Sequence, residues 1–120
     1  MKTSGIGRFV AKPELKTTKD GTFLSEFTLV YNEKRKVGEK LLEQAHYFDF
    51  VIWDKAADVV CKYFDKGDLI YIVQATPRQD RWEDKDGNKR SRVIFRVDNF
   101  EFVPNQKRKE NTESQTVTQE

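Results

Sequence analysis

Residues 46–67, HYFDFVIWDKAADVVCKYFDKG, change from a strand pattern to a helix pattern at Asp54. The first part is rich in aromatic and β-branched residues, which favours a strand over residues 46–53. Side-chain alternation puts Phe48, Phe50 and Ile52 on one face, which we expect to belong to the core. The other face carries Tyr47, Asp49, Val51 and Trp53.

A helix follows directly over residues 54–64. Asp54 is the expected N-cap and Gly67 the expected stop after the C-terminus. Between them the apolar residues have helical spacing, at Ala56, Val59, Val60, Tyr63 and Phe64. This is the one helix that the pattern predicts.

Strands are predicted on both sides of this unit. Residues 23–31 (FLSEFTLVY) alternate, with Phe23, Phe27, Leu29 and Tyr31 on one face and Glu26 and Thr28 on the other. Residues 69–76 (LIYIVQAT) and 92–103 (RVIFRVDNFEFV) form a long hairpin whose charged tip contains Asp86-Gly87-Asn88. Residues 2–10 supply a first strand that is only weakly hydrophobic.

Two segments are predicted to lack regular structure. Residues 32–45 (NEKRKVGEKLLEQA) are polar and contain Gly38, so we expect a long flexible connection with a short helical turn near residues 41–45. Residues 104–120 contain almost no apolar side chains and are expected to form a disordered tail.

The order of these elements predicts an all-β fold with one helix. Five strands with the helix between the third and the fourth match a five-stranded Greek-key barrel of the OB type, with a long hairpin of the last two strands. A chain of 120 residues suits one domain, which we place at residues 1–103.

Composition narrows the class of protein. No apolar run approaches the roughly 20 residues of a membrane span, and the N-terminus lacks the apolar stretch of roughly 7 to 15 residues that a secretory signal needs. Cys61 is the only cysteine, which excludes an intrachain disulfide and suits a reducing compartment. We therefore expect a cytoplasmic protein without a membrane partner.

Catalytic patterns are absent from the sequence. His46 is the only histidine, so a zinc site or a Cys–His pair lacks ligands, and no phosphate-binding GxxxxGK[ST] loop occurs. We expect no enzymatic activity, no cofactor and no metal. One alternative is a small nuclease in which Asp49, Asp54 and Asp58 bind Mg²⁺.

Two aromatic residues, Tyr47 and Trp53, lie on the face of the 46–53 strand that points away from the core. Every nucleobase has a π-face, so stacking on such rings contributes about 1 to 3 kcal/mol per base whatever the sequence. The alternative is that Trp53 covers the helix and Tyr47 packs under the 32–45 connection.

The net charge is only +2, so binding of a nucleic acid can be inferred only from local clusters of cations. Residues 78–92 (RQDRWEDKDGNKRSR) place cations around Trp82, a mixture that suits phosphates beside a stacked base. An exposed hairpin kept soluble by mixed charge is the alternative. Lys34, Arg35 and Lys36 form a second basic cluster, which a solvated loop explains equally well.

A series of motifs runs in order along the chain. Gly7-Arg8-Phe9 and Pro13-Glu14-Leu15 come first, followed by residues 17–22 (TTKDGT) and 27–29 (FTL). Residues 51–58 (VIWDKAAD), 63–68 (YFDKGD) and 82–87 (WEDKDG) complete the series. Over residues 4–103 they resemble the bacterial-type single-stranded DNA-binding proteins, including phage and mobile-element relatives.

The resemblance implies a site and partners. It implies stacking on Tyr47, Trp53 and Trp82, binding of single-stranded DNA without sequence preference during replication, recombination or repair, and a homo-oligomer, with a tetramer favoured. The full set of expected DNA-binding residues is Tyr47, Trp53, Trp82, Arg8, Lys34, Arg35, Lys55, Arg78, Arg81, Lys89 and Arg90.

The chain departs from the family pattern at two places. Residues 33–36 (EKRK) stand where many members have an aromatic residue, so we expect Arg35 to act there by charge or by stacking of its guanidinium group. The last residues, 116–120 (TVTQE), lack the acidic Pro-Phe tip, so we do not expect recruitment of partners through the C-terminus.

Two further alternatives follow from the residues. An OB-type accessory protein would use the same aromatic rings to bind protein partners. RNA is also a possible ligand, because a stacking platform does not sense the 2′-hydroxyl group.

Overall fold

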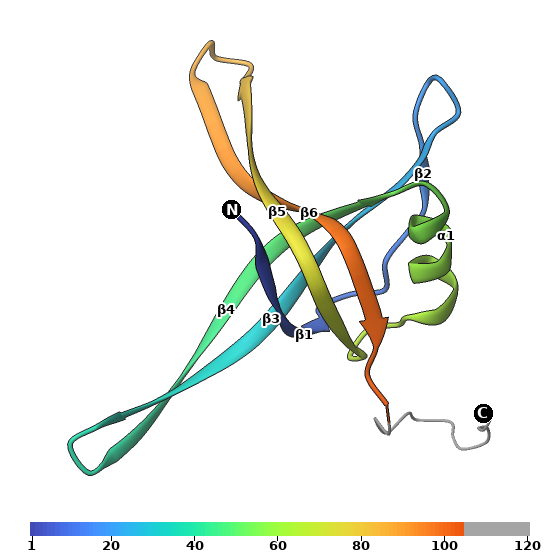
Figure 1. Cartoon of the computed structure of the whole chain (residues 1–120). Helices are drawn as coiled ribbons and strands as arrows, with labels where there is room; N and C mark the ends of the chain where they lie inside the picture. Colours follow the sequence, from blue (N-terminus) through green and yellow to red (C-terminus); the bar gives the residue numbers. More distant parts are fainter. Residues whose placement is uncertain (105–120) are drawn as a thin grey trace.

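A computed structural model describes residues 1–104 of the chain, which form six strands and one helix (Figure 1). The elements are β1 (Thr3–Phe9), β2 (Lys16–Thr17), β3 (Phe23–Val37), β4 (Lys40–Trp53), α1 (Asp54–Tyr63), β5 (Leu69–Glu83) and β6 (Lys89–Phe102). Residues 105–120, nearly all of the segment expected to be a disordered tail, lie outside the described residues.

The strands close into a barrel. The sheet order is β1-β5-β6-β4-β3-β2, and a second pairing of β1, with β3 through Arg8 and Phe9, joins the two ends. β4 and β6 run parallel where Phe50 lies beside Phe95, and every other pair of strands is antiparallel. β2 pairs with the start of β3 only, so five strands form the barrel and the predicted OB fold is confirmed.

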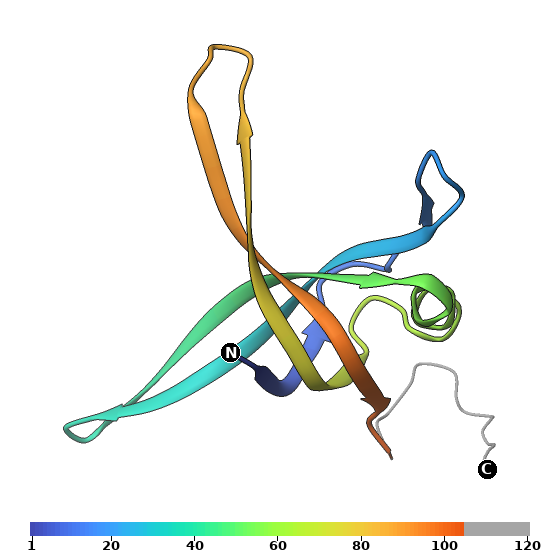
Figure 2. The same cartoon turned by 45° about the horizontal axis from the view of Figure 1, so that its top comes forward.

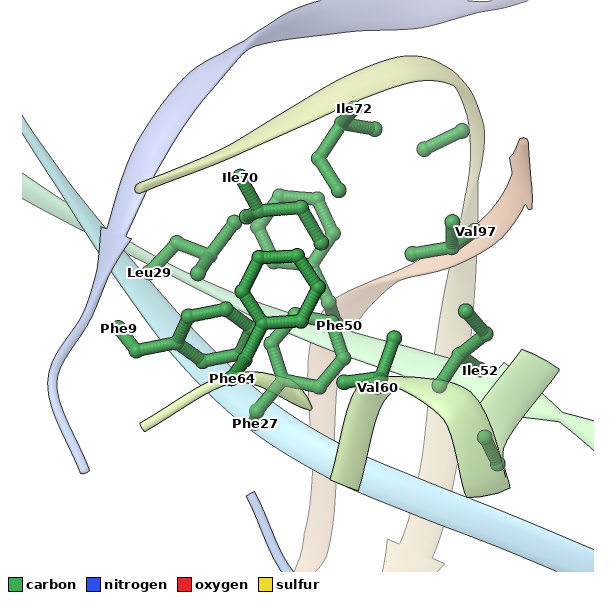
Figure 3. Packing of buried hydrophobic residues seen from close by; sticks show 12 residues of the cluster. Phe9, Phe27, Leu29, Phe50, Ile52, Val60, Phe64, Ile70, Ile72 and Val97 are labelled. Atoms are coloured by element: carbon green, nitrogen blue, oxygen red, sulfur yellow. The ribbon is translucent and has the colours of Figure 1, made fainter. Parts of the chain in front are cut away.

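Four phenylalanine rings form the centre of the core. Phe9 lies 5.0 Å from Phe27 and 5.1 Å from Phe64, and Phe27 lies 5.8 Å from Phe50, between ring centroids (Figure 3). Helix α1 adds Ala57 and Val60, both fully buried. The helix spans ten residues, and no helix within residues 1–104 is long or apolar enough to cross a membrane.

The predicted core faces are confirmed near the barrel and fail beyond it. Phe27, Leu29, Phe50 and Ile52 are buried as expected. Phe23, Tyr31 and Phe48 share that face but are about two-fifths exposed, because the strands there extend past the barrel. Val51 was assigned to the non-core face, yet only 6% of it is exposed, since Glu26 and Arg96 flank it on both neighbouring strands.

The prediction of a flexible connection over residues 32–45 is wrong. β3 and β4 stay paired from Leu24 and Trp53 out to Val37 and Lys40, so the segment is a two-stranded ribbon that extends from the barrel (Figures 1 and 2). Gly38 has a φ of +63° at the first central position of the turn, as a type II′ hairpin requires. The expected helical turn is part of β4, because the partner strand satisfies its backbone hydrogen bonds.

Both predicted ends of the helix need correction. Trp53, not Asp54, is the N-cap, and no side chain caps the helix there. Asp54 is the first helical residue, with a φ of +64°, and so turns the chain from strand into helix without a loop. The helix ends at Tyr63, and Gly67 belongs to the turn that follows, where its amide donates to the Phe9 carbonyl.

Candidate nucleic-acid interface

The strand register places the predicted aromatic residues on one side of the sheet. Directly paired residues share a face, and the face alternates along each strand. On β4, the side away from the core carries Tyr47, Asp49, Val51 and Trp53; on β5 and β6 it carries Arg78, Asp80, Trp82, Arg90, Arg92 and Arg96. We call this the outer face.

Tyr47 is the most exposed of the three rings. Its exposed fraction is 62%, which excludes the alternative that it packs under a loop. Tyr47 pairs with Val30, and Val30 pairs with Arg8, so all three lie in one row across β4, β3 and β1. Neighbouring strands lie about 4.8 Å apart, so the backbones of Arg8 and Tyr47, two strands apart, are separated by about 10 Å. The Arg8 guanidinium also donates a 2.6 Å hydrogen bond to the Gly67 carbonyl.

Trp53 borders a shallow cleft beside the turn between β2 and β3. The cleft is lined by Thr18, Lys19, Asp20, Thr22 and Trp53. The Asp20 carboxylate accepts hydrogen bonds from the Thr18 hydroxyl and the Thr22 amide, which lower its pKa and hold the turn in shape. Lys19 is therefore a cation next to Trp53 that the sequence did not indicate, because pairing of β2 with β3 brings it there.

Trp82 lies near the tip of the β5–β6 hairpin and is 47% exposed. It pairs with Arg90, whose Nε lies 2.9 Å from Asp84 Oδ2. The Asp84 carboxylate also accepts from the amides of Asp86 and Asn88, at 3.0 and 2.9 Å. These hydrogen bonds, of which the one from Arg90 has the largest effect, lower the pKa of Asp84 and close the tip of the hairpin. The predicted hairpin is confirmed and is longer than expected on both strands.

An open cleft beside Trp82 collects side chains from both sides of the hairpin. Its lining residues are Gln79, Arg81, Trp82, Glu83, Lys89, Arg90 and Ser91. Arg81 pairs with Ser91 and Lys89 pairs with Glu83, so these two cations project from the side opposite to Trp82 and Arg90. The hairpin therefore offers cations on both of its sides, with the indole on one.

The three cations of the basic cluster expected at residues 34–36 do not share one face of the β3–β4 ribbon. Lys34 pairs with Glu43 and lies on the side of Tyr47, whereas Arg35 pairs with Leu42 and lies on the opposite side with Tyr31 and His46. Successive residues of a strand point to opposite faces, so Lys34 and Arg35 are separated here, whereas in an unstructured loop they could point the same way. Lys55 is exposed in the first turn of α1, two residues after Trp53.

Two of the three carboxylates considered as Mg²⁺ ligands have other contacts. Asp49 accepts a 2.8 Å hydrogen bond from the Thr28 hydroxyl and lies 3.8 Å from Arg92, and Asp58 lies 3.7 Å from Lys62. Within residues 1–104, no group of three His, Cys, Asp or Glu side chains is placed to hold a metal ion. The contacts of Arg92 join four strands, so no local sequence pattern indicates them.

An OB barrel with exposed aromatic rings and cations on one face is typical of oligonucleotide-binding OB-fold proteins, and the fold and the site place the chain in this class. Within that class the chain belongs to the Single-strand binding protein family, whose family model matches residues 2–103. The resemblance drawn from the sequence motifs is thereby confirmed.

Relatives and a solved structure agree with this placement. The chain is 34% identical over 98 residues to a single-stranded DNA-binding protein of Treponema pallidum; the match covers 82% of this chain and 54% of the relative, about half its length. It is 35% identical over 99 residues to single-stranded DNA-binding protein 1 of Synechocystis, covering 82% of this chain and 78% of that protein.

The fold is similar to that of the Plasmodium falciparum SSB in its complex with ssDNA. The TM-score is 0.76 at 21% sequence identity, and the match covers 85% of this chain and 93% of the other.

Proposed function

We propose that this protein binds single-stranded DNA without sequence preference and protects it in the cytoplasm during replication, recombination or repair. It acts as a binder, without catalysis. The observation that carries the proposal is that Tyr47, Trp53 and Trp82 project from one face of an OB barrel and are 62%, 36% and 47% exposed. Large exposed rings on one face can each stack on a base of a single strand, whereas the bases of a duplex are already stacked on one another.

The cations of the outer face supply the phosphate contacts in this proposal. Arg8, Lys34, Arg78 and Arg90 lie on that face, and Lys55 and Lys19 flank Trp53. Arg81 and Lys89 reach a strand that follows the cleft beside Trp82. Arg35 faces the other way, so we expect it to contribute least.

The test is a titration of the intrinsic tryptophan fluorescence with oligo(dT) and with a duplex of equal length, at low and high salt. Trp53 and Trp82 are the only tryptophans of the chain, so the signal comes from two of the three proposed stacking residues. We expect strong quenching by the single strand alone, weakened by salt because phosphate contacts release counterions. Quenching by neither ligand would contradict the proposal and favour an OB-type accessory protein that binds protein partners.

The protein also assembles as a homo-oligomer in this proposal, with a tetramer favoured. An apolar patch supports it: Ile6 of β1, Tyr31 of β3 and Phe48 of β4 are 54%, 44% and 42% exposed and border one cleft. We call this the β1 patch. Tyr31 and Phe48 lie on the core-facing side of the β3–β4 ribbon, opposite to Tyr47, so a contact through these two rings leaves Tyr47 free for DNA. Exposed patches of this kind mark contact surfaces.

A further inference from the structure

Arg92 of β6 lies among three carboxylates that come from three other strands. Its Nη2 lies 3.4 Å from Glu26 of β3, its Nη1 lies 3.8 Å from Asp49 of β4, and its Nε lies 3.7 Å from Asp80 of β5. All four side chains are between 41% and 45% exposed. We call these four residues the Arg92 cluster.

The Arg92 cluster lies on the outer face. It joins β3 and β4 to β5 and β6, close in the chain to the residues through which β4 and β6 pair. Tyr47 and Trp53 flank it on β4, and Trp82 lies two residues beyond Asp80 on β5. A strand that stacks on all three rings therefore has to pass over or beside three carboxylates.

The guanidinium group of Arg92 is directed at the three carboxylates of the cluster. The nitrogens Nε, Nη1 and Nη2 each face a different carboxylate, so the planar fork of the arginine is directed into the cluster. Lys16, with its Nζ 3.9 Å from Glu26, adds one more cation. Without Arg92 the three acids would face a phosphate backbone, and Lys16 would be their one remaining ion-pair partner among residues 1–104.

We infer that Arg92 is a positioning residue for single-stranded DNA, which acts by neutralising Glu26, Asp49 and Asp80 so that phosphates can cross the middle of the outer face. Arg92 acts through these carboxylates and not by contacting phosphate itself. The inference rests on the proposed function, since it specifies how one part of that surface admits the strand.

The test compares Arg92→Gln with the wild type by oligo(dT) titration at several salt concentrations. We expect Arg92→Gln to lower affinity about tenfold or more at low salt, because like charges then face each other. The ratio of the two affinities should fall toward one as salt rises, since salt screens exposed charges. A defect in folding alone would not be relieved by salt.

The decisive arm is rescue by removal of an acid. Asp80→Asn should change wild-type affinity little but restore binding several-fold in the Arg92→Gln background, a coupling in the range found for contacting residues. Arg96→Gln is the matched control: Arg96 lies on the same strand and face, with its Nε 3.3 Å from Asp98. Asp80→Asn should not rescue Arg96→Gln.

Several outcomes would overturn the inference. If Asp80→Asn raises affinity by the same factor with and without Arg92, the arginine does not act through the acid. If Arg92→Gln fails to fold by circular dichroism, Arg92→Lys is the second variant: it keeps the positive charge among the acids and must therefore bind oligo(dT) nearly as well as the wild type, and a tenfold loss at low salt would contradict the inference. If Arg92→Gln binds oligo(dT) as well as the wild type does, this inference is wrong and the proposed function is unaffected. A wild type that does not bind oligo(dT) sinks the proposed function as well.

Discussion

Trp82 and Trp53 occupy different surroundings on the same face. Trp82 stands on a hairpin that extends from the barrel, with Arg90 directly opposite, whereas Trp53 is the last residue of β4 and borders the β2–β3 turn. Trp53 is 36% exposed and Trp82 is 47% exposed, so each ring leaves surface on which a base can stack.

We expect Trp82→Ala and Trp53→Ala each to weaken oligo(dT) binding by about 1 to 3 kcal/mol, the value of one base stacked on an aromatic ring. The chain should remain folded, because neither ring belongs to the core cluster. Fluorescence anisotropy of a labelled oligonucleotide measures the loss. Tyr63→Ala, at a 58% exposed ring at the end of α1, is the control and should bind normally. Unchanged affinity in both tryptophan variants would show that the stacking surface is assigned wrongly.

Gly7 is buried in β1 against Leu29 of the core. A Cβ added at Gly7 would lie 2.9 Å from Leu29 Cβ, closer than packed carbon atoms approach. We expect Gly7→Ala to destabilise the fold by about 1 to 3 kcal/mol, the usual cost of overpacking. Chemical denaturation measures the change. Gly5→Ala is not a matched control, because Gly5 has a φ of +158° near the bulge in β1. Ser4→Ala, at an exposed neighbouring position, should have little effect.

The β5–β6 hairpin depends on one carboxylate at its tip. The Asp84 carboxylate accepts hydrogen bonds from the Arg90 guanidinium and from two backbone amides, which lower its pKa from the ordinary value of 3.8. A group whose pKa is lower in the folded state stabilises that state above its ordinary pKa and loses this contribution as pH falls through the lowered value. The tip should therefore be ordered at neutral pH and fray in acid.

Amide hydrogen exchange checks this prediction for the tip. Exchange of the Asp86 and Asn88 amides should accelerate below the ordinary Asp pKa beyond the intrinsic pH effect. Asp84→Asn should show the faster exchange already at neutral pH. Asp20→Asn is a matched variant in the β2–β3 turn, where Asp20 also has a lowered pKa, and should leave the hairpin tip unchanged. Equal protection of the tip in wild type and Asp84→Asn at neutral pH would refute the role of Asp84.

Residues 1–104 together are more extended than a compact domain. Their radius of gyration is 16.8 Å, whereas a compact chain of about 100 residues has about 13 Å. The difference comes from the β3–β4 ribbon and the β5–β6 hairpin, which extend from the barrel in different directions (Figure 2). Two-stranded ribbons are only marginally stable by themselves in water, so contacts with DNA or with other copies would stabilise them.

The proposed assembly is tested by measuring the mass of the whole protein in solution. We expect light scattering to give four times the mass of the 14.1 kDa chain, and Ile6→Glu to reduce that mass by placing a charge in the β1 patch. Leu15→Glu, at a 39% exposed leucine outside the patch, is the control and should keep the mass of the wild type. A wild type with the mass of one chain would contradict the proposed assembly.

The strands, the helix and the identity of the aromatic residues follow from local patterns that are visible in the chain itself. Alternation along residues 46–53 and helical spacing after Asp54 predicted the strand-to-helix unit, and the order of the elements predicted the barrel. These signals are local because a strand or a helix repeats within a few residues. They fail where burial does not alternate, as in residues 32–45, where both sides of the ribbon are largely exposed.

Pairing between distant strands decided the rest. The register put Lys34 beside Tyr47 on the outer face and turned Arg35 away, although the two are adjacent in the chain. It also brought Lys19 to Trp53 and gathered Glu26, Asp49 and Asp80 around Arg92. Residue types and periodicity show which side chains can bind a nucleic acid. Which of them share a surface depends on the register of strands far apart in the sequence, which no local pattern contains.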